Sequence, residues 1–207
     1  MDPAPARVSE YAEQAVAYVR RALNLPLEYD SDTLPLLDHY LRNVPADQPA
    51  ATALVIATAG AYFGEVVRRR LGGRWEIPSP DDKHKGNGSG NGEPVVVPFE
   101  GADWRVVLPT ALSFSPAGIV ASAIAQADLD DLDSEIDAPP RMRPYVQQAL
   151  ARMGEVSVED YYSLCGRLDT LEHIHEVLVA VAAQMMGNQA EDDAPESTSD
   201  EPSGPVN

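Results

Sequence analysis

Apolar side chains recur every three or four positions over two long stretches of the chain, which is the spacing of one face of an amphipathic helix. The first stretch predicts a helix over residues 9–25, ending before Pro26. The second predicts a helix over residues 157–186, with an apolar stripe typical of a helical bundle or a coiled coil. The stripe consists of Tyr161, Leu164, Leu168, Leu171, Ile174 or His175, Leu178, Val181 and Met185.

Four further segments carry the start and stop signals of helices. The longest covers residues 49–71 and stops at Gly72-Gly73, where glycine accepts the left-handed conformation. Small residues crowd its middle and permit close approach of neighbouring elements, so we expect it to be the central helix of the fold. The other three helices are predicted between the capping run Asp30-Ser31-Asp32 and Pro45, over residues 116–127, and over residues 141–153.

Short runs of β-branched and aromatic residues follow the central helix and predict strands at residues 75–77, 95–99 and 104–108, the last two as a hairpin. The sequence therefore predicts a helix-rich α+β fold, with about six helices and a small antiparallel sheet of about three strands packed on the central helix. We expect residues 1–187 to form a single domain, with a flexible loop at 78–93 and an acidic loop at 128–140. Residues 188–207 are acidic and rich in Pro and Ser, which predicts a disordered tail.

The net charge of the chain indicates which class of macromolecule it binds. The 207-residue chain has a formal net charge of −18 at pH 7, concentrated in the tail and in the acidic loop. Because nucleic-acid affinity comes mostly from Lys and Arg that neutralise phosphates, this charge disfavours DNA or RNA and favours a protein partner. The carboxylates of the acidic loop are candidate interaction residues: Asp128, Asp130, Asp131, Asp133, Glu135 and Asp137.

Cysteine usage and the first residues indicate a cytoplasmic protein. Cys165 is the single cysteine and cannot form an intramolecular disulfide. The opening residues lack the basic start and apolar run of a secretory signal. The most apolar stretch, residues 49–63, is shorter than the roughly 20 apolar residues that span a bilayer, so we expect no membrane insertion.

Residues Gly60-Ala61-Tyr62-Phe63-Gly64-Glu65-Val66-Val67, followed by Gly72-Gly73-Arg74-Trp75, resemble a pattern of bacterial domain families of unknown function. In that pattern, a helix with a Gly-aromatic-aromatic-Gly-Glu core leads into a Gly-Gly-x-Trp strand. The resemblance implies a small α+β domain with a sheet packed on this helix, and it carries no activity to transfer. We expect Trp75 to fill the space that Gly60 and Gly64 leave free.

Glu65 is the one candidate functional carboxylate within this unit. It lies among small residues near the junction of helix and strand, where it could accept hydrogen bonds or take part in a site. The alternative is an ion pair with Arg68 or Arg69, which lie three and four positions along the helix.

The other reactive residues predict no catalytic, metal or cofactor site. His173 and His175 are about 200° apart around a helix and cannot share one ion, so we expect His175 near the apolar stripe and His173 in solvent. His84 lies in the flexible loop, and Cys165 adjoins the stripe as a small hydrophobe. The acidic loop lacks the spacing of an EF-hand, and the glycines at 86–92 lack the Lys-Ser/Thr ending of a P-loop.

Three hypotheses of function follow, of which we favour the first. It is a non-catalytic interaction protein of the adaptor, chaperone, immunity or regulatory type, which uses the acidic surface and residues such as Tyr161, Leu168 and His175 of the last helix. The second is an enzyme or small-ligand binder with a pocket between the central helix and the hairpin, using Glu65, Arg74 and Trp104. The third is a homo-oligomer in which the stripe of the last helix is the seam.

Overall fold

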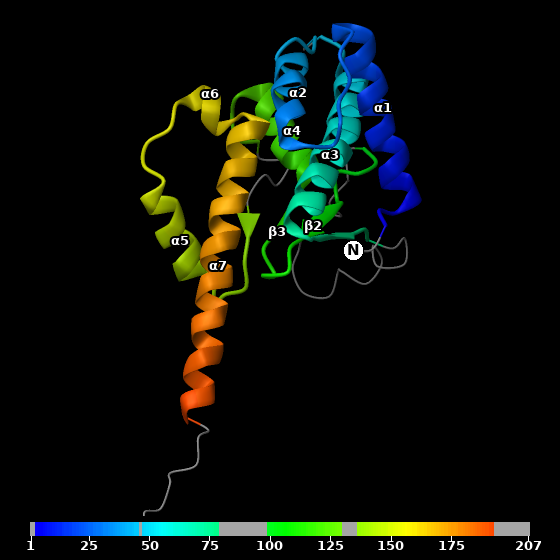
Figure 1. Cartoon of the computed structure of the whole chain (residues 1–207). Helices are drawn as coiled ribbons and strands as arrows, with labels where there is room; N and C mark the ends of the chain where they lie inside the picture. Colours follow the sequence, from blue (N-terminus) through cyan, green and yellow to red (C-terminus); the bar gives the residue numbers. More distant parts are fainter. Residues whose placement is uncertain (1–2, 46, 79–98, 130–135, 193–207) are drawn as a thin grey trace, which may run out of the picture.

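A computed structural model gives the fold, and it describes residues 3–45, 47–78, 99–129 and 136–192. These residues form a helix-rich α+β fold with seven α-helices and a four-stranded antiparallel sheet, which confirms the predicted fold class (Figure 1). The helices are α1 (Ala6–Leu23), α2 (Leu34–Leu41), α3 (Pro49–Leu71), α4 (Pro116–Ala125), α5 (Arg143–Arg152), α6 (Val158–Tyr161) and α7 (Leu164–Asp192). A 3-10 turn at Ser31–Thr33 precedes α2.

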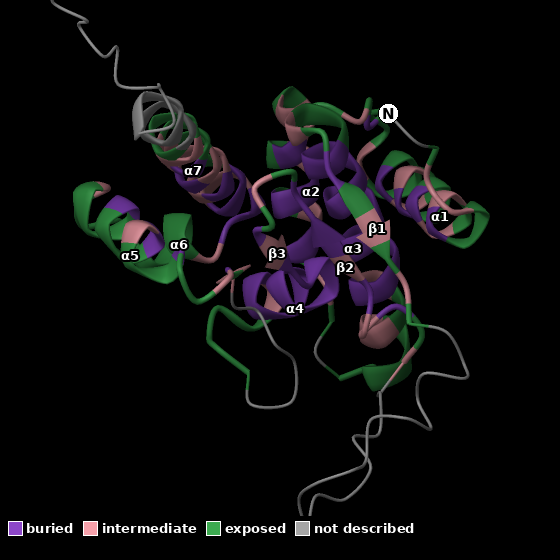
Figure 2. Ribbon diagram, turned by 90° about the horizontal axis from the view of Figure 1, so that it is seen from below, coloured by how far each residue is buried: buried purple, intermediate pink, exposed green. Residues whose placement is uncertain are grey.

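Helix α3 is the centre of the fold, as its small residues predicted. Every residue from Ile56 to Arg68 is buried, with α1 packed along one side and α4 along another (Figure 2). Pro49 begins the helix, where its missing N–H leaves no hydrogen bond unmade. Gly72 ends it with a φ of +76°, the left-handed conformation that glycine adopts without strain.

Two glycines of α3 allow two different neighbours to approach. A Cβ at Gly64 would overlap the ring of Trp75, so Trp75 fills the space beside this glycine as predicted. A Cβ at Gly60 would instead lie 3.0 Å from the Cα of Ala117 in the first turn of α4. The prediction that Trp75 fills both spaces is therefore correct for Gly64 and wrong for Gly60, which makes room for the backbone of α4.

Helix α3 is also the one helix among the described residues that is long and apolar enough to cross a membrane. The helix has 23 residues, and its apolar part is longer than the stretch of residues 49–63 that the sequence suggested. In the fold, 67% of its most apolar 18-residue window is buried. Such burial is typical of the core helix of a soluble domain and agrees with the prediction of no membrane insertion.

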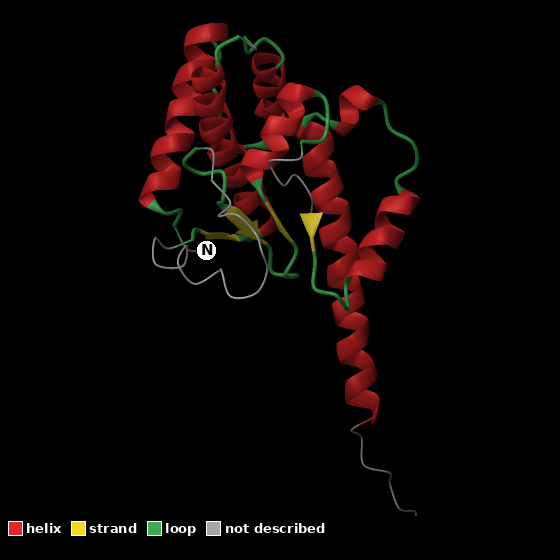
Figure 3. Cartoon of the chain, turned by 180° about the vertical axis from the view of Figure 1, so that it is seen from behind, coloured by secondary structure: helices red, strands yellow, loops and turns green. Residues whose placement is uncertain are grey.

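The sheet has the order β1-β2-β3-β4, with every neighbouring pair antiparallel. Its strands are β1 (Arg74–Glu76), β2 (Arg105–Val107), β3 (Ser113–Phe114) and β4 (Ile136–Asp137), and they lie near the end of α3 that leads into β1 (Figure 3). β1 and β2 match two predicted strands. Of the predicted strand at 95–99, only Phe99 lies within the described residues, and it is not in a strand. β3 and β4 are each two residues long, too short for a period of two to show in the sequence.

The prediction of one helix over residues 157–186 is wrong in its first part. The helix is interrupted at residues 162–163, between α6 and α7. The carbonyl of Asp160 accepts hydrogen bonds from both the N–H and the hydroxyl of Ser163, and it lies where a Cβ of residue 166 would be. Only glycine fits there, so Gly166 permits the tight turn. Tyr161 therefore belongs to α6 and lies outside the buried stripe of α7, which is Leu164, Leu168, Leu171, Ile174 and Leu178.

The predicted tail and the two predicted loops differ in part from the structure or lie outside the described residues. Helix α7 continues to Asp192, so residues 188–192 are helical rather than part of a disordered tail. Residues 79–98, which include most of the predicted flexible loop, and residues 193–207 lie outside the described residues, as do residues 130–135 of the acidic loop.

Candidate functional site

A cavity of about 1080 Å³ lies beside α5, α6 and α7. Its apolar lining comes from α5, from the loop after α5 and from the two sides of the undescribed residues 130–135. These side chains are Leu129, Ile136, Val146, Leu150, Met153 and Val156. The volume slightly exceeds the roughly 300–1,000 Å³ typical of ligand pockets.

The residues after α5 shape this cavity. Gly154 leaves the helix with a φ of +78°, and the chain then turns into α6. Ser157 caps α6 by accepting a hydrogen bond from the N–H of Asp160 at 3.1 Å, and it donates one to the Asp160 carboxylate at 2.7 Å. The short α6 thereby stands between α5 and the start of α7, so that three helices border one concave surface.

Large apolar side chains remain exposed around this cavity. Leu129, Leu150, Val156 and Tyr161 line it with exposed fractions of 37%, 44%, 55% and 44%, and Val158 on α6 is 67% exposed. Only four other large apolar side chains of the described residues are exposed, namely Leu25, Leu54, Val179 and Met185. The cavity is therefore where exposed apolar surface is concentrated.

Arg167 is a cationic side chain of the same cavity. It lies in the first turn of α7, is only 7% exposed, and its Nε has no hydrogen-bond partner among the described residues. Its guanidinium carbon lies 4.2 Å from the ring centroid of Tyr161 and 5.8 Å from that of Tyr162. The two rings give cation–π stabilisation but accept no in-plane hydrogen bond from the guanidinium.

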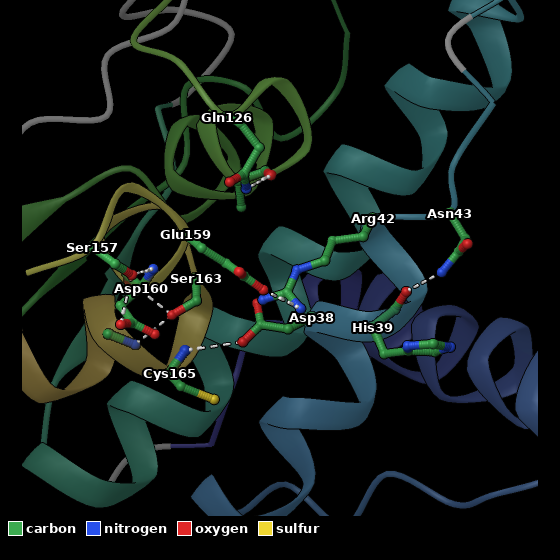
Figure 4. Close-up of polar contacts among 12 residues, drawn as sticks. Asp38, His39, Arg42, Asn43, Gln126, Ser157, Glu159, Asp160, Ser163 and Cys165 are labelled. Carbon is green, nitrogen blue, oxygen red and sulfur yellow. Dashed lines mark hydrogen bonds and ion pairs between the residues drawn. The ribbon is translucent and has the colours of Figure 1, made fainter.

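The amino end of α7 is held by α2. The buried carboxylate of Asp38 accepts the N–H of Leu164 at 2.7 Å and the N–H of Cys165 at 3.3 Å (Figure 4). Ser163 Oγ accepts the N–H of Gly166 at 2.9 Å, and the Ser163 carbonyl accepts that of Arg167 at 3.0 Å. All four N–H groups of the first turn are thus satisfied within the chain.

Cys165 also lines the cavity, as a protonated thiol. Burial, and after it the hydrogen bond and charge of Asp38, raise the pKa of its thiol to about 12. The thiol is therefore neutral at physiological pH, and only the thiolate attacks.

Glu65 lies inside the fold, away from this cavity's lining. Its carboxylate accepts hydrogen bonds from Arg68 Nε at 2.6 Å, Arg69 Nε at 3.2 Å and Trp75 Nε1 at 2.7 Å. Burial opposes its ionisation, but the hydrogen bonds from Arg68 and Trp75 and the two arginine charges outweigh burial and lower the pKa of Glu65. The expected ion pair with Arg68 or Arg69 is confirmed: Glu65 pairs with both, and the pair with Arg68 is buried.

The other two residues of the predicted pocket at the helix–hairpin junction take separate roles. Trp104 is buried and packs edge-on against Trp75, with ring centroids 6.3 Å apart. Arg74 is exposed and pairs with Glu76 at 2.7 Å. The three predicted residues therefore contribute to the core and to a strand surface.

The histidines are placed differently from each other. His175 Nδ1 lies 3.1 Å from Thr110 Oγ1, and burial lowers the pKa of His175. His173 was expected in solvent, but this is wrong, because its Nε2 is buried without a hydrogen-bond partner among the described residues. Across the described parts of the chain, no three His, Cys, Asp or Glu side chains come together as a possible metal site.

Apart from His175, the predicted interaction residues divide into four groups. Asp128 and Tyr161 line the cavity, whereas Asp137 is exposed and pairs with Arg143 at 3.3 Å. Leu168 is only 3% exposed, so it belongs to the core and not to a surface, which corrects the prediction. Asp130, Asp131, Asp133 and Glu135 lie outside the described residues.

Sequence reasoning missed Arg167, Leu150 and Val156. Arg167 directly precedes Leu168 of the apolar stripe. A charged residue next to core positions is the feature of the sequence that could have indicated a buried cation there. Val156 and Val158 are apolar residues in a short polar segment, which also indicates a surface that the chain leaves uncovered.

Comparison of the chain with protein-family models, with curated proteins and with solved structures gives no match. Function is therefore inferred from the geometry and chemistry of the cavity.

Proposed function

We propose that this chain is a non-catalytic protein-interaction protein, of the adaptor, chaperone, immunity or regulatory type, and that it binds its partner in the cavity beside α5, α6 and α7. The observation that carries the proposal is the concentration of exposed apolar side chains there, from Leu129 to Tyr161. Soluble chains rarely leave such surface uncovered unless it binds something.

The form of the surface supports a partner that inserts apolar side chains. Leu150 precedes the bend at Gly154 and Val156 follows it, and both line the same cavity as Tyr161. Interface energy is concentrated where a few side chains enter such concave apolar sites and lose their water. An amphipathic segment of a protein partner offers side chains at the required spacing.

Charge supports a partner with basic residues at its edge. Asp128, Asp160 and Asp169 line the cavity, and the chain as a whole carries −18. Such a field attracts a cationic protein, accelerates its association and weakens as salt is added.

Capture of the partner from the native host tests the proposal, with one substitution in the cavity and a matched one outside it. Leu150 on α5 and Leu54 on α3 are both helical leucines, with exposed fractions of 44% and 42%. We expect the full chain and Leu54→Asp to retain the same host protein and Leu150→Asp to lose it. Equal retention by both variants, or no partner for the full chain, would overturn the proposal.

Self-assembly through α7 is the second candidate. Val179 and Met185 are exposed on α7, the helix whose carboxyl-terminal part extends beyond the other helices (Figure 1). If the chain dimerises through α7, replacement of both Val179 and Met185 by Glu should reduce its molecular mass in solution from that of a dimer to that of a monomer. Leu168→Asp does not test it, because Leu168 is buried and its change would unfold the monomer.

A further inference from the structure

We infer that the partner places a single carboxylate against Arg167, from an acidic side chain within an otherwise apolar segment. This inference rests on the proposed function of the cavity and names the chemistry of its occupant. It is carried by Arg167, a buried cation at the lining of the cavity whose Nε has no hydrogen-bond partner among the described residues.

The surroundings of Arg167 leave its hydrogen-bonding capacity incompletely used. Tyr161 and Tyr162 contact the guanidinium with their rings, at 4.2 and 5.8 Å from the centroids. A guanidinium has five N–H donors in one plane, and a carboxylate accepts two of them in parallel. A buried donor left without an acceptor is costly, so a carboxylate that enters from a partner gains more here than at an exposed arginine.

The position of Arg167 in its helix argues in the same direction. The amino end of a helix has a partial positive charge, and a cation in the first turn is unfavourable there. Asp38 occupies the N–H groups of Leu164 and Cys165, and Ser163 those of the next two residues, so the backbone has no free donor to offer. The anion would therefore be bound by the side chain of Arg167 and not by backbone N–H groups.

The other carboxylates of the cavity limit what the partner can carry. Asp160 accepts a hydrogen bond from Ser157, and Asp128 and Asp169 are exposed at the same lining. A partner with several acidic residues would be repelled by these three groups. The best complement is a protein segment with an apolar face, one Asp or Glu within that face, and Lys or Arg on either side of it.

Selection of binders from a displayed library of random peptides, with the full chain as target, tests this composition. A parallel selection uses Arg167→Met, which keeps the length of the side chain and removes its charge and donors. We expect peptides selected by the full chain to share an acidic residue flanked by apolar ones, and to bind Arg167→Met about tenfold more weakly or worse. Peptides selected by Arg167→Met are expected to lack the acidic residue.

The outcomes separate the inference from the function on which it rests. Peptides that are lost with Leu150→Asp but bind the full chain and Arg167→Met equally would overturn the role of Arg167 and keep the cavity as the docking site. Selection only of peptides insensitive to Leu150→Asp, or selection of no peptide together with no Arg167-dependent binding of decanoate, would overturn both. If decanoate binds in an Arg167-dependent way, decanol does not, and no peptide is selected, the site takes a small amphipathic acid and the inferred protein segment is wrong.

Discussion

The carboxylate of Asp38 accepts a hydrogen bond from the backbone N–H of Leu164 at 2.7 Å, across 126 positions of the chain. Asp38 lies on α2, and Leu164 is the first residue of α7. This one side chain therefore fixes where α7 begins relative to the helices around α3. It also fixes one side of the cavity, because Cys165, Gly166 and Arg167 follow directly.

Removal of this carboxylate is expected to destabilise the fold. Asp38→Ala leaves the N–H groups of Leu164 and Cys165 without their acceptor, and loss of such a cap costs about 1–2 kcal/mol of unfolding free energy. Urea unfolding measures the change. Asp32→Ala, at an exposed carboxylate in the turn before α2, is the control and should stay within about 0.5 kcal/mol of the unaltered chain. A midpoint for Asp38→Ala equal to that of the control would contradict this role.

Glu65 is expected to make stability depend on pH in the acid range. Its pKa in the fold lies below the ordinary value of 4.5, so its contribution is fully present above 4.5 and is lost as the pH falls through the lowered pKa. Glu65→Gln should cost about 3 kcal/mol at pH 7, because it replaces the buried carboxylate that pairs with Arg68 and Arg69 by a neutral amide. The difference in unfolding free energy between the two proteins should shrink towards acid pH. A difference that is constant from pH 7 downwards would contradict the assignment.

Cys165 is expected to react slowly with thiol reagents. Its thiol has a pKa of about 12, so at pH 8 only a minute fraction is thiolate, and the group is half-buried as well. Ellman's reagent should label the unfolded chain at pH 8 much faster than the folded chain. The Asp38→Ala variant should react at an intermediate rate, since the first cause of the raised pKa is burial and the next is Asp38. Fast labelling of the folded chain would show that the thiol is open and ionised.

Arg167 is expected to contribute to partner binding and not to the free energy of unfolding. Replacement by Met removes a buried cation with an unsatisfied donor and keeps the volume, a change that is neutral or stabilising by about 1 kcal/mol in comparable sites. The unfolding midpoint of Arg167→Met should therefore be equal to or above that of the unaltered chain. Its affinity for the captured partner should nevertheless fall. A strong loss of stability would show that Arg167 supports the fold instead.

The sequence predicted what local spacing determines. The helix over residues 49–71 was predicted to the residue, because Pro49 and Gly72 mark both ends and small residues mark its close neighbours. The predicted ion pair of Glu65 with Arg68 and Arg69 also follows from helical spacing alone. These features depend on residues within a few positions of one another.

Features set by distant residues could not be predicted in this way. The start of α7 depends on Asp38, which lies 126 positions before Leu164 in the sequence. Each strand of the β3–β4 pair is two residues long and is defined only by its partner. The cavity itself arises from the packing of α5 and α6 beside α7, so the exposure of Leu150 and the burial of Arg167 appear only in three dimensions.

Hydrogen–deuterium exchange of the full chain, with and without the captured host partner, tests the central claim most directly. The account predicts slower exchange of backbone N–H groups in α5, α6 and the loop between them when the partner is bound, with α1 unchanged. Protection confined to α1 or to β1, with α5 and α6 unchanged, would contradict the placement of the binding site in this cavity.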